Sequence, residues 1–136
     1  MSVRVRTNYR AVVKDLRRGM TNAVKQVVIN VHKRLIAPPG EGGTPVQTGY
    51  ARSNWLVNIG GPAAGTVGSR ASVRGVSSPV VALAGYTLRH GNVYITNNVS
   101  YIVGLNDGTS RQAPAAFVQR AIDRGVQQSL GMVLRA

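Results

Sequence analysis

The sequence predicts an α+β fold in which a small antiparallel sheet is packed by a long N-terminal helix and a C-terminal helix, with Gly-rich arms or loops. Apolar residues recur at helical spacing near both ends of the chain. Two short runs of β-branched and aromatic residues lie between those ends and indicate strands. The 136 residues suit a single domain, because two separate cores in this length would each be small.

Residues 1–36 are expected to contain a basic N-terminal helix, with its periodic part over 8–36. Its apolar stripe follows steps of three and four residues: Val13, Leu16, Met20, Val24, Val27, Val31 and Leu35. Thr7 or Asn8 can cap its start, and Pro38-Pro39 ends it. A second face is interpreted as a basic stripe, for which a solvated surface is the alternative: Lys14, Arg18, Lys25 and His32.

The middle of the chain is expected to hold short elements separated by loops. Residues 37–47 form a Pro/Gly loop, and residues 48–112 contain short helices, strands and a long loop. The expected elements of the second segment are a short helix from Thr48 to Asn54, a strand at Trp55–Ile59, a loop or extended arm at 63–77, a helix starting at Ser78-Pro79, a strand at Asn92–Thr96, a short element from Tyr101 and a loop from Gly104 to Arg111.

Residues 113–136 are expected to form a C-terminal helix that opens at Pro114. Its apolar face is Phe117, Ala121, Val126, Leu130 and Val133 or Leu134. With only seven aromatic residues in the chain, Val, Ala and Leu must fill most of the core. A small core beside Gly-rich arms suggests that neighbouring subunits contribute stability.

Composition excludes several classes of protein. The chain has no cysteine, which rules out a disulfide scaffold, thiolate metal sites and a cysteine nucleophile. No apolar run reaches the ~18 residues of a membrane span, and residues 1–10 lack the apolar core of a signal peptide, so a cytoplasmic, membrane-free protein is expected. The net charge of +13 implies a polyanionic partner. Nine of the seventeen cations but one of the four acids lie in residues 1–36, which places the expected partner surface there.

The residues predict no catalytic, metal or cofactor site. The four acids are spread through the chain, without a close pair for acid–base chemistry: Asp15, Glu41, Asp107 and Asp123. His32 and His90 lack neighbours at metal-ligand spacing. The Gly-rich segments are not followed by Gly-Lys-Ser/Thr, so they do not match a phosphate-binding loop. An enzyme is therefore not expected.

Three segments together resemble a known family. Residues 45–55 (PVQTGYARSNW), 94–101 (YITNNVSY) and 106–114 (NDGTSRQAP) are similar, in order and spacing, to motifs of tailed-bacteriophage neck or tail-completion (head–tail joining) proteins of the HK97 gene-10-like family. The similarity spans about residues 45–120. The chain departs from the family pattern at Gln47, where an acid is usual, at Ser100, where a proline is usual, and at Asn106-Asp107, where a glutamate two residues before the glycine is common.

The resemblance implies a structural virion protein that forms a ring, expected to be a hexamer, at the head–tail junction around the DNA conduit. Its implied partners are the head connector or head-closure proteins and the tail terminator or tail tube proteins, with non-specific contact to duplex DNA also open. Two alternatives remain at this point: a tail terminator or minor tail protein, and a free basic nucleic-acid-binding protein.

Two sets of residues are singled out for these roles. We expect the cations of the N-terminal helix to contact either the DNA in the lumen or an acidic partner ring: Arg10, Lys14, Arg17, Arg18 and Lys25. The motif residues are expected to be architectural: Thr48, Gly49, Tyr101, Gly108, Ser110 and Pro114. In this interpretation Thr48 caps the short helix, Gly49 permits close approach and Gly108 allows a turn. Tyr101 buries its ring at the sheet edge, and Pro114 fixes the first turn of the last helix.

Overall fold

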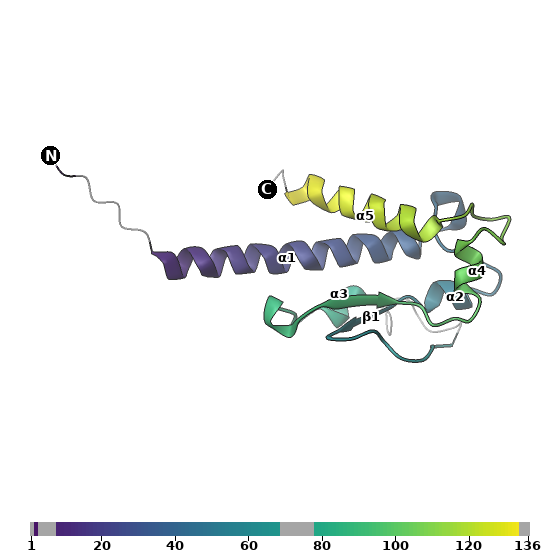
Figure 1. Cartoon of the computed structure of the whole chain (residues 1–136), viewed down its shortest axis with the longest axis horizontal. Helices are drawn as coiled ribbons and strands as arrows, with labels where there is room; N and C mark the ends of the chain where they lie inside the picture. Colours follow the sequence, from purple (N-terminus) through teal and green to yellow (C-terminus); the bar gives the residue numbers. More distant parts are fainter. Residues whose placement is uncertain (1, 3–7, 69–77, 134–136) are drawn as a thin grey trace.

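The computed structural model of the chain describes residue 2, residues 8–68 and residues 78–133 (Figure 1). The elements in chain order are α1 (Tyr9–Leu35), the 3-10 helix η1 (Pro39–Glu41), α2 (Tyr50–Ser53), β1 (Leu56–Ile59), α3 (Pro79–Ala82), the 3-10 helix η2 (Leu88–His90), β2 (Val93–Thr96), α4 (Ile102–Asn106) and α5 (Phe117–Val133). The predicted α+β class is confirmed. α1 forms a middle layer, with α5 packed on one side and the two-stranded sheet on the other (Figure 1).

The boundaries of α1 agree with the sequence. The side chain of Asn8 caps the helix by accepting a hydrogen bond from the Ala11 N–H at 3.2 Å, and the helix ends at Leu35, before the prolines. Its second half is buried, whereas its first half projects beyond the rest of the molecule (Figure 1). The apolar stripe therefore continues well past the part of the helix that the core covers.

The sheet consists of β1 and β2 alone among the described residues. The strands are antiparallel, with Leu56 opposite Thr96 and Ile59 opposite Val93. Gly60 follows β1 with a φ of 85°, a left-handed conformation that favours glycine, and it ends the strand as the sequence predicts. The sheet packs on α1 through a second apolar cluster, whose buried members are Val28, Leu83 and Tyr86.

After its first turn, α5 packs on α1 through small side chains. The buried residues of this face are Phe117, Ala121, Gly125 and Ser129, at steps of four. A Cβ atom built on Gly125 would lie 2.7 Å from the N and Cα atoms of Val31, so the two helix backbones approach as closely as glycine allows. The prediction of Leu130 on the apolar face was wrong, because its side chain is 55% exposed.

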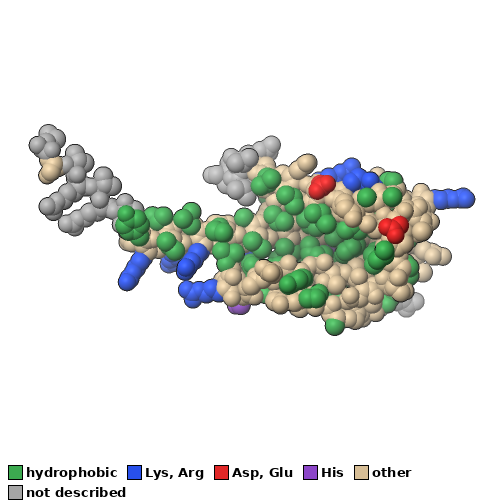
Figure 2. All heavy atoms as spheres, in the orientation of Figure 1, with side chains coloured by type: hydrophobic (Ala, Val, Ile, Leu, Met, Phe, Trp, Pro, Cys, Tyr) green, Lys and Arg blue, Asp and Glu red, His purple; other side chains and the backbone are tan. Residues whose placement is uncertain are grey.

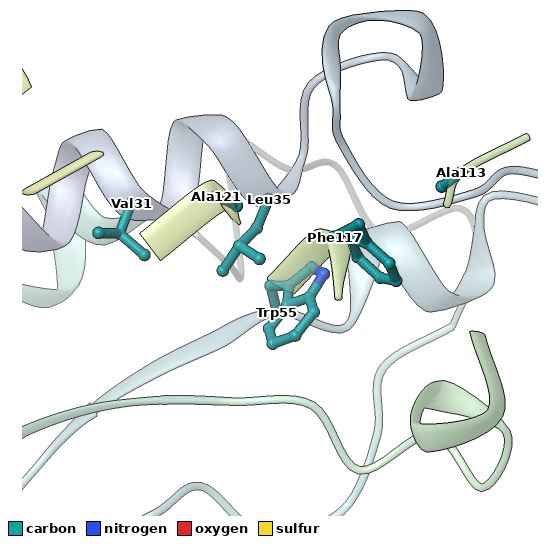
Figure 3. Close-up of a cluster of buried hydrophobic side chains, with 6 residues drawn as sticks. All are labelled: Val31, Leu35, Trp55, Ala113, Phe117 and Ala121. Carbon is teal, nitrogen blue, oxygen red and sulfur yellow. The ribbon is translucent and has the colours of Figure 1, made fainter. Parts of the chain in front are cut away.

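The main core lies where α1, α5 and the segment before β1 meet. Leu35, Trp55 and Phe117 belong to one cluster, shown in Figure 3, and each is at most 6% exposed. Thr44 holds this cluster from the loop before α2: its Oγ1 accepts a 2.7 Å hydrogen bond from Trp55 Nε1 and donates one of 2.7 Å to the Leu35 carbonyl. The predicted Pro/Gly loop at 37–47 thus contains η1 and a residue that is fully buried.

Three further predictions required correction. α5 begins at Phe117 rather than at Pro114, because Ala116 adopts a φ of 62° that interrupts the helix. Gly104 lies within α4, not in the predicted loop. Tyr101 is 47% exposed and precedes α4, so it does not bury its ring at the sheet edge. Residues 63–68 of the predicted 63–77 loop have no regular structure, and 69–77 lie outside the described residues.

None of the helices in the described part of the chain has the length and apolar character needed to cross a membrane.

Candidate functional site

The three motif segments, which are far apart in sequence, meet in space. The Gln112 side chain clamps the backbone of Val46, accepting from its N–H at 2.7 Å and donating to its carbonyl at 2.8 Å. Asn97 donates to the Ala51 carbonyl at 2.8 Å and therefore joins the second motif to the first. These amides act as backbone clamps, and the three motifs form one structural unit.

The motif unit surrounds a surface depression of about 580 Å³. Four of the six predicted motif residues line it: Thr48, Gly49, Tyr101 and Ser110. The prediction that Thr48 caps α2 was wrong, because the N-cap is Gly49; the Thr48 hydroxyl, one residue earlier, accepts from the Tyr50 N–H at 3.3 Å. Gly49 has a φ of 81°, and a Cβ atom added there would have no neighbouring atom within 4 Å, so it supplies the turn rather than the predicted close approach.

The other two motif residues shape the entry to α5. Gly108 has a φ of 94° and makes the predicted turn after α4. Pro114 lies before the helix, where its carbonyl accepts from the Arg120 guanidinium at 3.1 Å. The cap of α5 comes from Asn106, whose Oδ1 accepts from the Val118 N–H at 3.0 Å. Sequence reasoning missed this cap, because Asn106 precedes the helix by more than ten residues.

A cationic cleft lies between the projecting half of α1 and η2. Two depressions of about 470 and about 290 Å³ share Arg17 and Arg89 in their walls. Arg10 and Lys14 complete the first, and Arg18 lies in the second with two hydroxyl side chains. Figure 2 shows basic side chains along the lower edge of the projecting helix. Arg89 was not predicted, because it lies 72 residues beyond Arg17 and only the fold of η2 against α1 joins them.

The cleft carries almost no counter-charge. Among the described residues the one ion pair joins Arg18 to Asp15 at 3.4 Å, and both side chains are more than two-thirds exposed. Such an exposed pair contributes little to stability. Arg10, Lys14, Arg17 and Arg89 thus stand together without a carboxylate in ion-pair reach within the described part of the chain. Guanidinium groups so arranged can grip phosphate or carboxylate oxygens with two parallel hydrogen bonds.

The remaining members of the predicted basic stripe lie elsewhere. Lys25 is half-buried, and its Nζ donates to the Ala84 carbonyl at 3.5 Å, which ties α1 to the turn after α3. His32 is 1% exposed and belongs to the core, so its assignment to the stripe was wrong. Its Nε2 lies 3.0 Å from the Trp55 carbonyl, an acceptor, and therefore carries the proton. Burial lowers the pKa of His32 below its usual value, partly offset by this hydrogen bond.

Within the described ranges, no three His, Asp or Glu side chains gather where they could hold a metal ion. The motif unit contributes hydrogen-bonding groups to its depression, and the cationic cleft contributes positive charge. No family model, curated protein or solved structure matches this chain.

Proposed function

We propose that this chain is a structural subunit of a tailed phage, which forms a homo-oligomeric ring at the head–tail junction, joins the connector to the tail and surrounds the DNA conduit. The observation that carries the proposal is the set of three ordered motifs at 45–55, 94–101 and 106–114, which resemble those of neck and tail-completion proteins. Their convergence on one unit supports a shared architectural role, because the Gln112 and Asn97 clamps both join different motifs.

The shape of the molecule supports an assembly role. About half of α1 projects from the body and exposes large apolar side chains, among them Leu16 at 61% and Met20 at 58% (Figure 1). An isolated helical arm gains most of its stability from packing against something else. A subunit whose arm packs against another protein of the particle fits a ring between two larger assemblies.

The cationic cleft supports docking on an acidic protein surface at least as well as contact with DNA. Each phosphate contact adds to affinity for duplex DNA, and a conduit that held DNA tightly would hinder its passage. A complementary acidic ring gains from the same charges during assembly, because long-range attraction speeds and orients the encounter. Placement as a tail terminator uses the same surfaces and differs only in position along the tail. A free nucleic-acid-binding protein would use the cleft but leave the exposed apolar side chains of α1 without a role.

The charge of the cleft provides the test. Reversing it with Arg17→Glu and Arg18→Glu should impair head–tail joining in a complementation assay that counts tailed particles by electron microscopy. The matched control reverses two exposed cations of the body outside the three motifs, Lys33→Glu and Arg124→Glu, and should leave joining within about twofold of the unmodified chain. Normal joining in the Arg17 and Arg18 variant would contradict both roles of the cleft.

A further inference from the structure

The projecting half of α1 has an apolar stripe that no described part of the chain covers. Its members, with their exposed fractions, are Tyr9 (76%), Val12 (45%), Val13 (43%), Leu16 (61%) and Met20 (58%). Figure 2 shows hydrophobic side chains along the upper edge of this arm. Large apolar side chains that recur along one helix face over three turns are unusual for a solvent-exposed helix and mark an interaction surface.

The stripe continues the surface of α1 on which α5 packs. Leu16 and Met20 are in helical register with Val27 and Val31, which contact the core beside α5. The two helices are antiparallel (Figure 1), and α5 packs on the C-terminal half of α1, where Asn30 Nδ2 donates to Ser129 Oγ at 2.9 Å. The arm therefore offers further positions of a face that is already built to receive a helix.

The charges beside the stripe define what can lie on it. Arg10, Lys14 and Arg17 occupy the neighbouring face of the arm, and Asp15 is the one acid of the described arm, already paired with Arg18. A second copy of this chain is a poor match, because each copy carries a net charge of +13 and has four acids in all. Duplex DNA matches the cations but has no apolar seam for Leu16 and Met20. A helix with an apolar seam and acidic flanks can cover the apolar stripe and pair with the cations beside it.

We propose that the projecting arm of α1 docks an amphipathic helix of a different protein, one whose apolar seam is flanked by Asp or Glu. Apolar side chains of that helix pack on Leu16 and Met20, while its carboxylates meet Arg10 and Arg17. The inference names the partner chemistry for the assembly role proposed above and rests on that role for its biological meaning. Peptide binding is measured with the purified protein, so it can be absent even if the chain forms a ring at the junction. Conversely, the peptide can bind even if the chain forms no such ring.

The experiment uses the full chain and two fluorescent peptides of equal length, both with a leucine seam at heptad positions a and d. One peptide carries Glu at e and g, and the other carries Lys. Fluorescence anisotropy should show at least about tenfold tighter binding of the Glu peptide, with affinity falling as salt is raised. Equal binding of the two peptides, or no binding of either, would overturn the proposal.

Two double variants separate the contributions of the two faces. Leu16→Ala with Met20→Ala should lower the affinity for the Glu peptide by about tenfold or more, because each substitution reduces the apolar area that is buried when the peptide binds. Arg10→Gln with Arg17→Gln should lower the affinity for the Glu peptide by a similar factor and make that affinity less dependent on salt concentration. All four changes keep good helix formers, and circular dichroism checks that the helix content is unchanged.

Matched controls lie on the body of the same chain. Val80→Ala with Val81→Ala removes exposed apolar side chains from α3, and Lys33→Gln with Arg124→Gln removes exposed cations. Both should bind the Glu peptide within about twofold of the unmodified chain. Controls that weaken binding as much as the arm variants would contradict the assignment to α1. Self-association of the chain that is lost only in the Leu16 and Met20 variant would also contradict the proposal, because the occupant of the arm would then be a second copy. Displacement of the peptide by anionic vesicles or by duplex DNA would contradict it as well, if that displacement requires Leu16 and Met20.

Discussion

Gly125 is the residue at which the packing of α5 on α1 is most sensitive to a single added methyl group. In Gly125→Ala the new Cβ would lie 2.7 Å from the N, Cα and Cγ2 atoms of Val31, distances that side chains essentially never adopt. Backbone atoms cannot rotate away, so α5 must separate from α1 and loosen the contacts of Phe117 and Ala121. Overpacking of this kind costs about 1–3 kcal/mol, whereas alanine in a helix gains about 1 kcal/mol over glycine.

The net expectation is a loss of up to about 2 kcal/mol in the free energy of unfolding, which lowers the melting temperature by up to roughly 7 °C in a domain of this size. Urea denaturation followed by circular dichroism measures it. Gly19→Ala and Gly131→Ala are matched controls, because both positions are helical and have no atom within 4 Å of the added Cβ. These should stabilise the chain by up to about 1 kcal/mol. A Gly125→Ala protein as stable as the two controls would refute the close approach of the helices.

Three further changes test the core and the caps. Burial lowers the pKa of His32, so the unfolded state takes up the proton first as the pH falls. The free energy of unfolding should therefore decrease as the pH drops below about 6.5, the value for an exposed histidine, and His32→Gln should flatten that slope in urea titrations. Thr44→Val leaves the Trp55 indole N–H without its partner and should cost about 1–3 kcal/mol, whereas Thr44→Ser should cost much less, as measured by Trp fluorescence on denaturation. Asn106→Ala removes the acceptor for the Val118 N–H and should cost about 1 kcal/mol by the same measurement.

The regular elements could be predicted because their signals are local. Helix α1 follows from a long run of 3.6-residue periodicity, from the capping residue Asn8 and from the prolines after Leu35. The two strands follow from short β-branched runs that end at glycine or asparagine. Each of these signals lies within a few residues of the element that it predicts.

Burial could not be predicted so well, because periodicity identifies an apolar face but not what covers it. Leu16 and Leu35 belong to the same stripe, yet one is 61% exposed and the other 2%. On α5 the face toward α1 is chosen by size rather than hydrophobicity, since the close approach accepts Gly125 and Ser129 and leaves Leu130 outside.

The candidate sites were predicted in part. The sequence identified the three motifs and the cations of α1, whereas their spatial partners depend on long-range folding. Arg89 joins the cationic cleft only because η2 lies against α1. Likewise, Gln112 and Val46 are 66 residues apart, so no local sequence pattern predicts the hydrogen bonds between them. His32 is not part of the exposed basic stripe, because the packing of α1 on the segment before β1 buries its side chain.

The central claim is an assembly role at a phage head–tail junction, and cryo-electron microscopy of particles that contain this chain tests it most directly. The account predicts a ring of these subunits at the junction, with the projecting arm of α1 in contact with a neighbouring protein. Particles whose junction is fully resolved and holds no copy of this chain would contradict the account, and duplex binding by the purified protein would then favour the nucleic-acid-binding alternative.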